Sequence, residues 1–322
     1  MLQRGHHRSI ATPQCLCPVC GNTDWELIID TTDRAKRLGG LKVEHAGSSR
    51  LSIGSIQVLC CSVCGLGQQN PMPSPESLAS LYSGMRDELY LVEASGRRQT
   101  FRRCLRLLLR YTDRASGVLL DVGCSTGIFM ELAQEAGWSV SGVEPSKWLA
   151  ERAQERFGVR VLSTTFEAAR LAEQSFDVVT MWDVLEHTAE PAAIVDKAAH
   201  LLRPGGILAL NVPNIESVIA RLMSSRWPLL LPEHLYYFSP ASLRLLLAQH
   251  GFSVLRLHLH PVHFSIGYLL HRLSQHNLPG IQLIRTVTRT LRLQDKIVPA
   301  LMGESTVIAV RDISRTDDSQ MR

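Results

Sequence analysis

The middle of the chain alternates short apolar runs with stretches of helical periodicity. Residues 118–122 form a continuous apolar run, which is typical of a strand covered on both faces, and further strands are expected at 139–143, 159–162, 175–182 and 207–212. The helical stretches span residues 128–136, 146–157 and 191–202. Strands separated by helices of this length form right-handed βαβ units. The pattern therefore predicts an α/β fold built on a parallel sheet.

The flanking regions have weaker patterns, and they suggest the domain organisation. Residues 25–29 and 53–59 are expected to be short strands, with a polar loop at 33–50 between them. A proline-rich stretch at 70–75 marks a boundary, and a short helix is expected to end at Tyr82. We expect four parts, namely a small module, a helical bridge, the main domain and a disordered tail, at residues 1–75, 76–115, 116–313 and 314–322.

Two segments of the main domain interrupt its regular pattern. Residues 214–245 precede and enter a helix expected at 239–249, and we expect them to act as a lid over the sheet edge. After a strand at 252–258, residues 261–302 carry leucines at helical spacing together with several arginines. Packing is the favoured interpretation of this helical insertion, and dimerisation or contact with a membrane surface are its alternatives.

A helix expected over residues 97–111 presents apolar residues on one face and arginines on the rest. We interpret the arginines as a solvated face, with phosphate or membrane binding as the alternative. The formal net charge of +4 is too weak a basic field to require nucleic acid. No apolar run approaches the roughly 18 residues that span a bilayer, and residues 1–11 lack the apolar stretch of a secretory signal. We expect a cytoplasmic protein.

Six of the eight cysteines lie in the first 64 residues, and four of them form two matching pieces. Each piece is C-x-x-C followed by glycine, and the thiols are Cys17, Cys20, Cys61 and Cys64. Paired thiolates at this spacing, each followed by a glycine that permits positive φ, predict a closed four-sulfur zinc site. Such a site is structural, and we expect it to lie apart from the chemistry. Cys15 and Cys60 leave a shifted ligand set as an alternative.

Beyond the carboxyl ends of parallel strands lies the usual ligand site of such a sheet. The first strand runs into the loop Gly123-Cys-Ser-Thr-Gly127, and the second strand ends at Glu144. The glycines let the backbone approach a ligand, and the Glu144 carboxylate can accept the two hydroxyls of a ribose. The G-x-G-x-x-G and G-x-x-x-x-G-K-[ST] motifs are absent, which disfavours dinucleotides and nucleoside triphosphates. Individually, Asp121 and Glu144 could instead be helix or turn caps, and Trp182 a core residue.

In order along the chain, the segments 120–127, Glu144, 176–187 and 202–208 resemble the motifs of class I S-adenosylmethionine-dependent methyltransferases. The resemblance covers roughly residues 117–260 and implies a Rossmann-like, mostly parallel seven-stranded sheet with helices on both faces. It departs from the family at Ser125, where many members have glycine. It also implies the cofactor-binding residues, which are Asp121, Gly123, Cys124, Ser125, Gly127, Glu144, Thr165, Phe166, Trp182 and Asp183. Among them, Thr165 and Phe166 would flank the adenine, and Trp182 and Asp183 would lie beside the sulfonium.

The acceptor side is implied by a second likeness. A cysteine-rich module combined with Glu233 and His234 is similar to sugar C-methyltransferases, in which a Glu and a His serve as acid and base. His187 resembles a common family residue and is a further candidate base. Those enzymes continue into a further large domain, which this chain is too short to contain. A pocket-shaping role for the His234 segment remains the alternative.

The favoured function is methyl transfer from S-adenosylmethionine to a small-molecule acceptor, which would be a sugar, a lipid-linked glycan or a quinone-like compound. We expect S-adenosylmethionine and a structural zinc as cofactors, no nucleic-acid partner and no transmembrane segment. One alternative is an RNA methyltransferase whose zinc module grips RNA, which the arginine-rich helix supports and the near-neutral charge opposes. The other is a non-catalytic protein that keeps the cofactor site and docks a partner through its zinc module.

Overall fold

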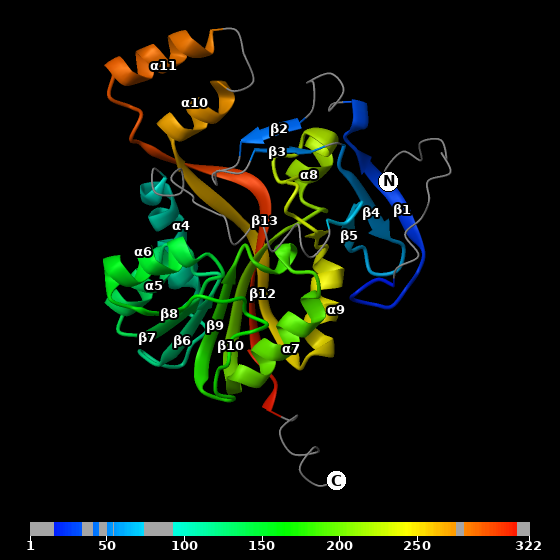
Figure 1. The fold of residues 1–322 in the computed structure, drawn as a ribbon, viewed down its shortest axis with the longest axis vertical. Helices are drawn as coiled ribbons and strands as arrows, with labels where there is room; N and C mark the ends of the chain where they lie inside the picture. Colours follow the sequence, from blue (N-terminus) through cyan, green and yellow to red (C-terminus); the bar gives the residue numbers. More distant parts are fainter. Residues whose placement is uncertain are drawn as a thin grey trace.

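A computed structural model describes residues 16–33, 41–44, 50–53, 55–73, 93–274 and 280–313 of the chain (Figure 1). Cys15, the short helix expected before Tyr82 and the tail at 314–322 lie outside the described residues.

The described part of the main domain is built on a seven-stranded sheet with the order β12-β13-β10-β9-β6-β7-β8. Its strands are β6 (Val118–Val122), β7 (Ser139–Val143), β8 (Arg160–Leu162), β9 (Phe176–Trp182), β10 (Leu202–Pro213), β12 (Phe252–Ser265) and β13 (Ile297–Arg311). Every pairing from β10 to β8 is parallel, and β13 alone runs antiparallel to both of its neighbours. The predicted fold class is confirmed.

Helices cover both faces of this sheet because alternate residues of each buried strand point to opposite sides. Leu119, Val178 and Ile207 pack on one side with α4 (Ala94–Leu108) and α5 (Ile128–Glu135). Their neighbours Leu120, Val179 and Leu208 pack on the other side with α7 (Pro191–Leu201) and α9 (Pro240–Gln249). The helix α6 (Lys147–Phe157) begins at Ser146, whose hydroxyl accepts a hydrogen bond from the Leu149 amide.

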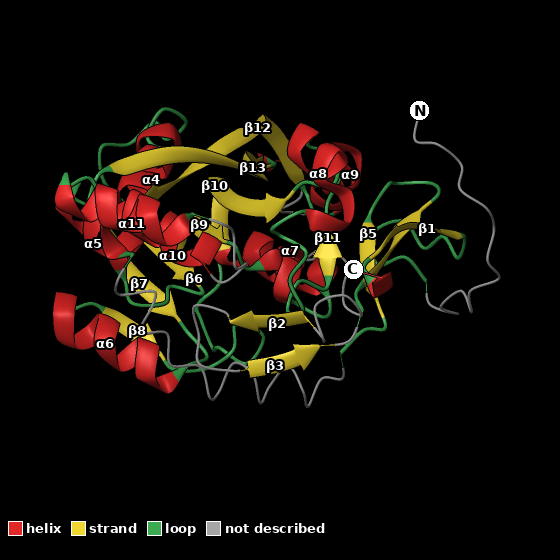
Figure 2. Ribbon diagram, turned by 90° about the horizontal axis from the view of Figure 1, so that it is seen from above, coloured by secondary structure: helices red, strands yellow, loops and turns green. Residues whose placement is uncertain are grey.

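The N-terminal module forms a second, four-stranded sheet with the order β1-β4-β5-β11. It consists of β1 (Trp25–Asp30), β4 (Gln57–Cys61), β5 (Gly67–Asn70) and β11 (Tyr236–Tyr237), and its last strand comes from the predicted lid segment. A separate hairpin joins β2 (Leu41–Glu44) to β3 (Arg50–Ile53), as Figure 2 shows. The loop expected at 33–50 and the single strand expected at 53–59 are therefore wrong in part. Among the described residues these two strands pair only with each other, so their place in the fold is not set by either of the larger sheets.

The strands β12 and β13 are longer than predicted, because they continue beyond the sheet as a two-stranded ribbon paired up to Ser265 and Ile297. The predicted insertion at 261–302 is thus helical only in its middle, in α10 (Ile266–Ser274) and α11 (Ile281–Thr290). Both helices lie at the far end of the ribbon (Figure 1). The apolar residues Leu283, Ile284, Val287 and Leu291 are 46–68% exposed, so close packing is wrong for this face of α11.

The predicted lid segment at 214–245 is well packed rather than loose. It contains α8 (Val218–Met223) and the 3₁₀ turn η2 (Ser224–Arg226), and it leads into β11 and α9. Trp227, Leu235 and Tyr237 are at most 1% exposed. None of the helices within the described ranges combines the length and hydrophobicity that crossing a bilayer requires.

Candidate functional site

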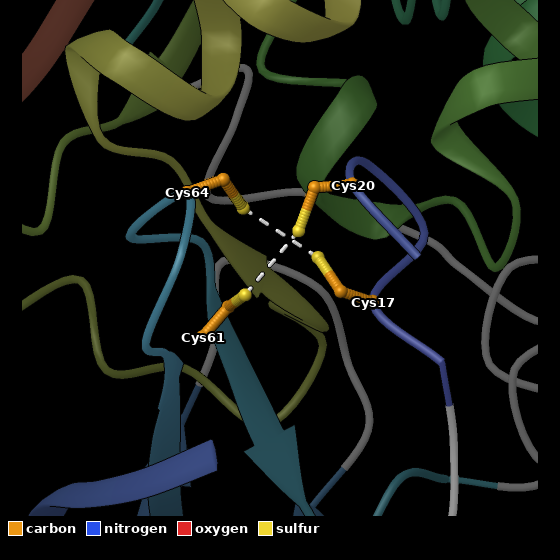
Figure 3. A group of neighbouring side chains, drawn as sticks. All are labelled: Cys17, Cys20, Cys61 and Cys64. Carbon is orange, nitrogen blue, oxygen red and sulfur yellow. Dashed lines mark hydrogen bonds between the residues drawn. The ribbon is translucent and has the colours of Figure 1, made fainter. Parts of the chain in front are cut away.

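The four cysteines predicted to bind metal converge at one end of the module. Their sulfur atoms all lie within 4.8 Å of one another, and the Sγ–Sγ distance is 3.5 Å both for Cys17–Cys64 and for Cys20–Cys61. Figure 3 shows the four side chains pointing at a common centre. A tetrahedral zinc ion with Zn–S bonds of about 2.3 Å would hold its sulfurs about 3.8 Å apart, so the arrangement fits zinc.

The two halves of this cluster have the same local geometry. In each half the amide of the glycine after the second cysteine donates to the carbonyl of the first, at 2.9 Å for Gly21–Cys17 and 3.0 Å for Gly65–Cys61. Both glycines adopt φ values of 73–74°, as the repeated motif predicts. The cysteines in the described part of the chain form no disulfide. Cys60 is not one of the four converging cysteines, and burial raises the pKa of its thiol to about 11.

The module is joined to the main domain beside its candidate acceptor residues. Strand β5 pairs with β11, and the Gln69 amide donates to the Leu235 carbonyl at 2.8 Å. The Leu235 amide in turn donates to the Glu186 carbonyl at 2.8 Å. The Ser239 hydroxyl, which caps α9, donates to the Cys64 carbonyl at 3.0 Å. A chain of backbone contacts therefore links the cysteine cluster to the His234 segment, and the expectation that the cluster lies apart from the chemistry stays a prediction.

At the carboxyl-terminal edge of the sheet, the glycine loop is tied to the second strand through Glu144. One carboxylate oxygen of Glu144 accepts from the Ser125 amide and the other from the Ser146 amide, both at 2.9 Å. Glu144 is 6% exposed, and loss of hydration raises the pKa of its carboxyl to about 7. Each oxygen keeps a second lone pair that can accept a ligand hydroxyl. The N-cap of the following helix is Ser146, so Glu144 is not that cap.

Asp121 lies in β6 and faces β9, where its carboxylate accepts from the Thr180 hydroxyl at 2.6 Å. Burial, together with the nearby charge of Glu144, raises the pKa of its carboxyl to about 7. The described contacts of Asp121 thus join two strands rather than cap the turn after β6. Two acids of raised pKa at adjacent strand ends are typical of a functional site.

The loop itself has the strained backbone that a close approach requires. A Cβ atom on Gly123 would lie 2.6 Å from the Val184 side chain, so only glycine fits there. Ser125 adopts φ 49°, a left-handed conformation that costs a non-glycine residue roughly 1–2 kcal/mol. The Cys124 side chain packs against Gly142 and Met130, which leaves only its backbone for a ligand.

Gly127 begins α5 with φ 79°. Thr126 beside it is 1% exposed, and its hydroxyl has no hydrogen-bond partner among the residues that the structure describes. Sequence reasoning missed this hydroxyl because threonine is common in such loops.

The other predicted cofactor residues have mixed surroundings. Thr165 is exposed, and its hydroxyl accepts from the Ala168 amide at 3.3 Å. The Phe166 ring is buried, with the Lys197 ammonium 5.1 Å from its centroid. The Trp182 ring is 6% exposed and packs edge-on against Phe129 at 5.0 Å. The core alternative for Trp182 therefore agrees with its packing.

Asp183 follows β9 with φ 56°. Desolvation by the surrounding protein raises the pKa of its carboxyl, against the opposing charge of Arg97 and a hydrogen bond from Asn211. Burial and the charge of Asp183 also raise the pKa values of Glu186 and Glu304 well above their usual range. Sequence reasoning missed Arg97 and Glu304, which come from α4 and β13 and meet Asp183 only in the folded chain.

The three candidate catalytic residues are brought together in part. The rings of His187 and His234 lie edge-to-face with centroids 4.7 Å apart. Each Nδ1 is 2.9 Å from a backbone carbonyl, that of Glu233 for His187 and that of Leu229 for His234. The third residue whose ligand atom joins them within 4.8 Å is Glu186, which precedes His187 in the 3₁₀ turn η1 (Leu185–His187). Glu233 meets His187 through its backbone carbonyl.

Comparison with known families agrees with this geometry. A family model described as a methyltransferase domain matches residues 97–257, which is half of the chain. The chain belongs to this methyltransferase-domain family. The match includes the glycine loop, Glu144 and the Glu186–His187 turn.

Two curated relatives and one solved structure illustrate the range of similar proteins. The chain is 26% identical to the C-methyltransferase NovU of Streptomyces niveus over 269 residues, which are 80% of this chain and 60% of that protein. It is 33% identical to the ubiquinone biosynthesis O-methyltransferase of Pseudomonas paraeruginosa over 118 residues, 34% of this chain and 51% of that one. The chain thus spans between half and two thirds of the length of these relatives.

Among solved structures, the magnesium protoporphyrin IX methyltransferase of Synechocystis PCC 6803 is 17% identical, with a TM-score of 0.47 over 68% of this chain and 84% of that chain.

Proposed function

We propose that this protein transfers a methyl group from S-adenosylmethionine to a small-molecule acceptor, such as a sugar, a lipid-linked glycan or a quinone-like compound. The observation that carries the proposal is the hydrogen bond from the Ser125 amide to the buried carboxylate of Glu144, which joins the glycine loop to the tip of the second strand. Membership of the methyltransferase-domain family supports it, and so do relatives whose names describe a C-methyltransferase and a ubiquinone O-methyltransferase.

S-adenosylmethionine supplies a methyl group on a sulfonium sulfur, so the electrophile needs no further activation. In this proposal Glu144 accepts the ribose hydroxyls, the Gly123–Gly127 backbone binds the methionine part, and Thr165 and Phe166 flank the adenine. Asp183, Glu186 and Glu304 lie close enough to affect one another's pKa values, and in this proposal a bound sulfonium would favour their ionised forms.

On the acceptor side, the chain has to orient the nucleophile, exclude water and take up one proton. Because Nδ1 of His187 and of His234 donates to a carbonyl, Nε2 is the ring atom that can accept a proton. Loss of the proton leaves an electron pair on the acceptor atom, which attacks the methyl carbon. The carbon–sulfur bond breaks, and its electron pair stays on sulfur. Glu233 is the third candidate for this acid–base role.

The cysteine cluster is proposed to bind a structural zinc ion. Four thiolates fill a tetrahedral zinc ion and leave no position for water, so the ion would hold the module together. Through β5 and β11 it would also support the His234 segment.

A cytoplasmic location stays a prediction from the sequence. The composition of α11 supports contact of the protein with an anionic membrane surface. Its exposed apolar residues alternate with Arg285, Arg289 and Arg292, and residues 281–292 contain no acid. Co-sedimentation with anionic but not with zwitterionic vesicles tests this contact.

The proposed function is tested by cofactor binding and by transfer of labelled methyl groups into a cell extract separated into lipid, small-molecule, protein and RNA fractions. Glu144→Ala should weaken binding of S-adenosylmethionine about 10- to 100-fold, because a charged acceptor of two hydroxyl hydrogen bonds is removed. Glu151→Ala is the matched control, since that acid lies exposed on α6. Label in the lipid or small-molecule fraction supports the proposal. Label in RNA, or no cofactor binding by the unmodified protein, overturns it.

A further inference from the structure

The residues Glu186, His187 and His234 form a second cluster of metal-ligand type, distinct from the cysteines. They come from two segments far apart in the chain, the turn η1 after β9 and the segment before β11. One ligand atom from each lies within 4.8 Å of the other two. One carboxylate and two imidazoles converging on a point are a known set for divalent transition metals, and three protein ligands leave coordination positions open.

The backbone around this cluster fixes both histidines in a metal-binding tautomer. Nδ1 of His187 lies 2.9 Å from the Glu233 carbonyl, and Nδ1 of His234 lies 2.9 Å from the Leu229 carbonyl. A carbonyl can only accept, so each Nδ1 carries the hydrogen and each Nε2 carries the lone pair. In metal sites the ligating histidine commonly donates its other ring N–H to a backbone carbonyl in this way.

The burial of the Glu186 carboxylate also favours a bound metal ion. Glu186 is 1% exposed, and its Oε2 has no hydrogen-bond partner within the part of the chain that the structure describes. Its charged neighbours include two further acids, Asp183 and Glu304. A buried carboxylate is costly unless a cation or hydrogen bonds compensate it, and Arg97 is shared with both of those acids. A divalent cation would supply the missing positive charge.

We propose that Glu186, His187 and His234 bind a divalent metal ion through one carboxylate and two imidazole nitrogens, with the remaining coordination positions open to a ligand. Mn²⁺, Fe²⁺, Co²⁺ and Zn²⁺ suit this mixed oxygen and nitrogen set. That the open positions take an oxygen of the methyl acceptor rests on the proposed function; the metal site itself does not.

A metal at this position would change the chemistry of the acceptor half of the reaction. Coordination of an acceptor hydroxyl or carbonyl oxygen makes the hydroxyl, or the carbon–hydrogen bond beside the carbonyl, more acidic. The proton leaves to water, and the electron pair that remains attacks the methyl carbon. In this arrangement His187 and His234 are ligands rather than bases.

The test is direct binding of Mn²⁺ alone to the full-length protein, without S-adenosylmethionine or acceptor. Free Mn²⁺ is measured by electron paramagnetic resonance, and bound metal by elemental analysis after dialysis. Four thiolates favour zinc over Mn²⁺, so the cysteine cluster should not contribute. The expected result is one saturable Mn²⁺ per chain, with affinity at least tenfold weaker in Glu186→Gln and His234→Gln. His200→Gln, an exposed histidine on α7, should bind as the unmodified protein does.

The outcomes of this test distinguish the metal site from the proposed methyl transfer. Absence of saturable Mn²⁺ binding by the unmodified protein overturns the metal site, and so does Mn²⁺ binding that Glu186→Gln leaves unchanged. Circular dichroism and the thermal midpoint show whether each variant has folded. If Glu186→Gln does not fold, His187→Gln changes a half-buried ligand of the same site and must lose the metal. Metal binding without any methyl transfer would refute the proposed function alone.

Discussion

The two ligand clusters of this molecule differ in how they are assembled and in what they leave open. The cysteine cluster is built from two copies of one local turn, each with its own C-x-x-C-G sequence, and its four sulfurs lie within 4.8 Å of one another, which suits a closed tetrahedral site. The cluster of Glu186, His187 and His234 is built from two unlike segments and supplies three ligands. A closed set of soft ligands is typical of a structural site, whereas an incomplete set of harder ligands is typical of a site that takes a further ligand.

The two clusters are also connected. Strand β5 follows the second cysteine turn, pairs with β11 and so borders the segment that carries His234. The Leu235 amide then continues the path to the Glu186 carbonyl. A substitution in the cysteine cluster should therefore change the geometry of the acceptor side. It should leave cofactor binding at β6 and β7 unchanged, so the cofactor affinity can serve as an internal reference.

The largest effect is expected from Cys61→Ser, which removes one of the four sulfurs. Loss of a structural metal should lower the free energy of unfolding by more than about 3 kcal/mol, because the small module has little core of its own. Zinc content and chemical denaturation measure this loss. Cys60→Ser is the matched control, because its side chain lies next in sequence but outside the cluster. Equal losses in the two variants would remove the distinction between cluster and neighbour.

The second-largest effect is expected from a substitution in the cluster of Glu186, His187 and His234. His234→Gln should lower kcat for methyl transfer by about a hundredfold or more, whether the ring acts as base or as ligand. The affinity for S-adenosylmethionine should stay within about twofold of the unmodified protein, measured by calorimetry, because Glu144 and the glycine loop are untouched. A large loss of cofactor affinity would show that the two sides of the site are not separable.

The affinity for S-adenosylmethionine should depend on pH. Substitutions in either ligand cluster should leave this pH dependence unchanged. The pKa values of Asp121 and Glu144 are raised to about 7 in the free protein. If ribose hydroxyls bind the ionised carboxylate, affinity at pH 6 should be about tenfold weaker than at pH 8. The free energy of unfolding of the cofactor-free protein should change with pH in the opposite direction. Each raised pKa contributes stability below the unfolded pKa, near 4, and this stability is lost as the pH rises towards 7.

Titration calorimetry and thermal melts at several pH values measure both slopes. Cys61→Ser, provided that its main domain remains folded, should keep the binding slope, and Glu144→Gln should flatten it. An affinity that is constant between pH 6 and 8 would contradict a ribose-binding carboxylate of raised pKa.

The smallest effect should come from Gly67→Ala, at the contact between module and main domain. A Cβ atom there would lie 3.1 Å from the Tyr237 Cβ and 3.2 Å from the Ile215 side chain. The strands must separate slightly, so we expect a loss of about 1 kcal/mol in stability and a few-fold fall in kcat, without a change in cofactor affinity. Val63→Ala, an exposed position in the same module, is the control. Unchanged kcat in a visibly destabilised Gly67→Ala would break the proposed link between the clusters.

The bounds of some strands could be predicted from the sequence, and those of others could not. Both β6 and β7 were predicted with their observed bounds, because each is a short stretch of strand type that ends at a turn, and β6 is also buried along its last four residues. The hairpin β2–β3 and the extensions of β12 and β13 were not, because in the described part of the chain each of these segments pairs with one partner strand only.

The sequence by itself determined the alternating fold, the glycine loop followed by Glu144, and the two cysteine turns, because each depends on residues close together in the chain. Only the tertiary structure decided that the cysteine module adds its sheet to the His234 segment, and that Glu186 joins His187 and His234. It also decided that Arg97 and Glu304 face Asp183. Contacts of this kind join distant segments, and their geometry is set by how the sheets and helices pack rather than by local spacing.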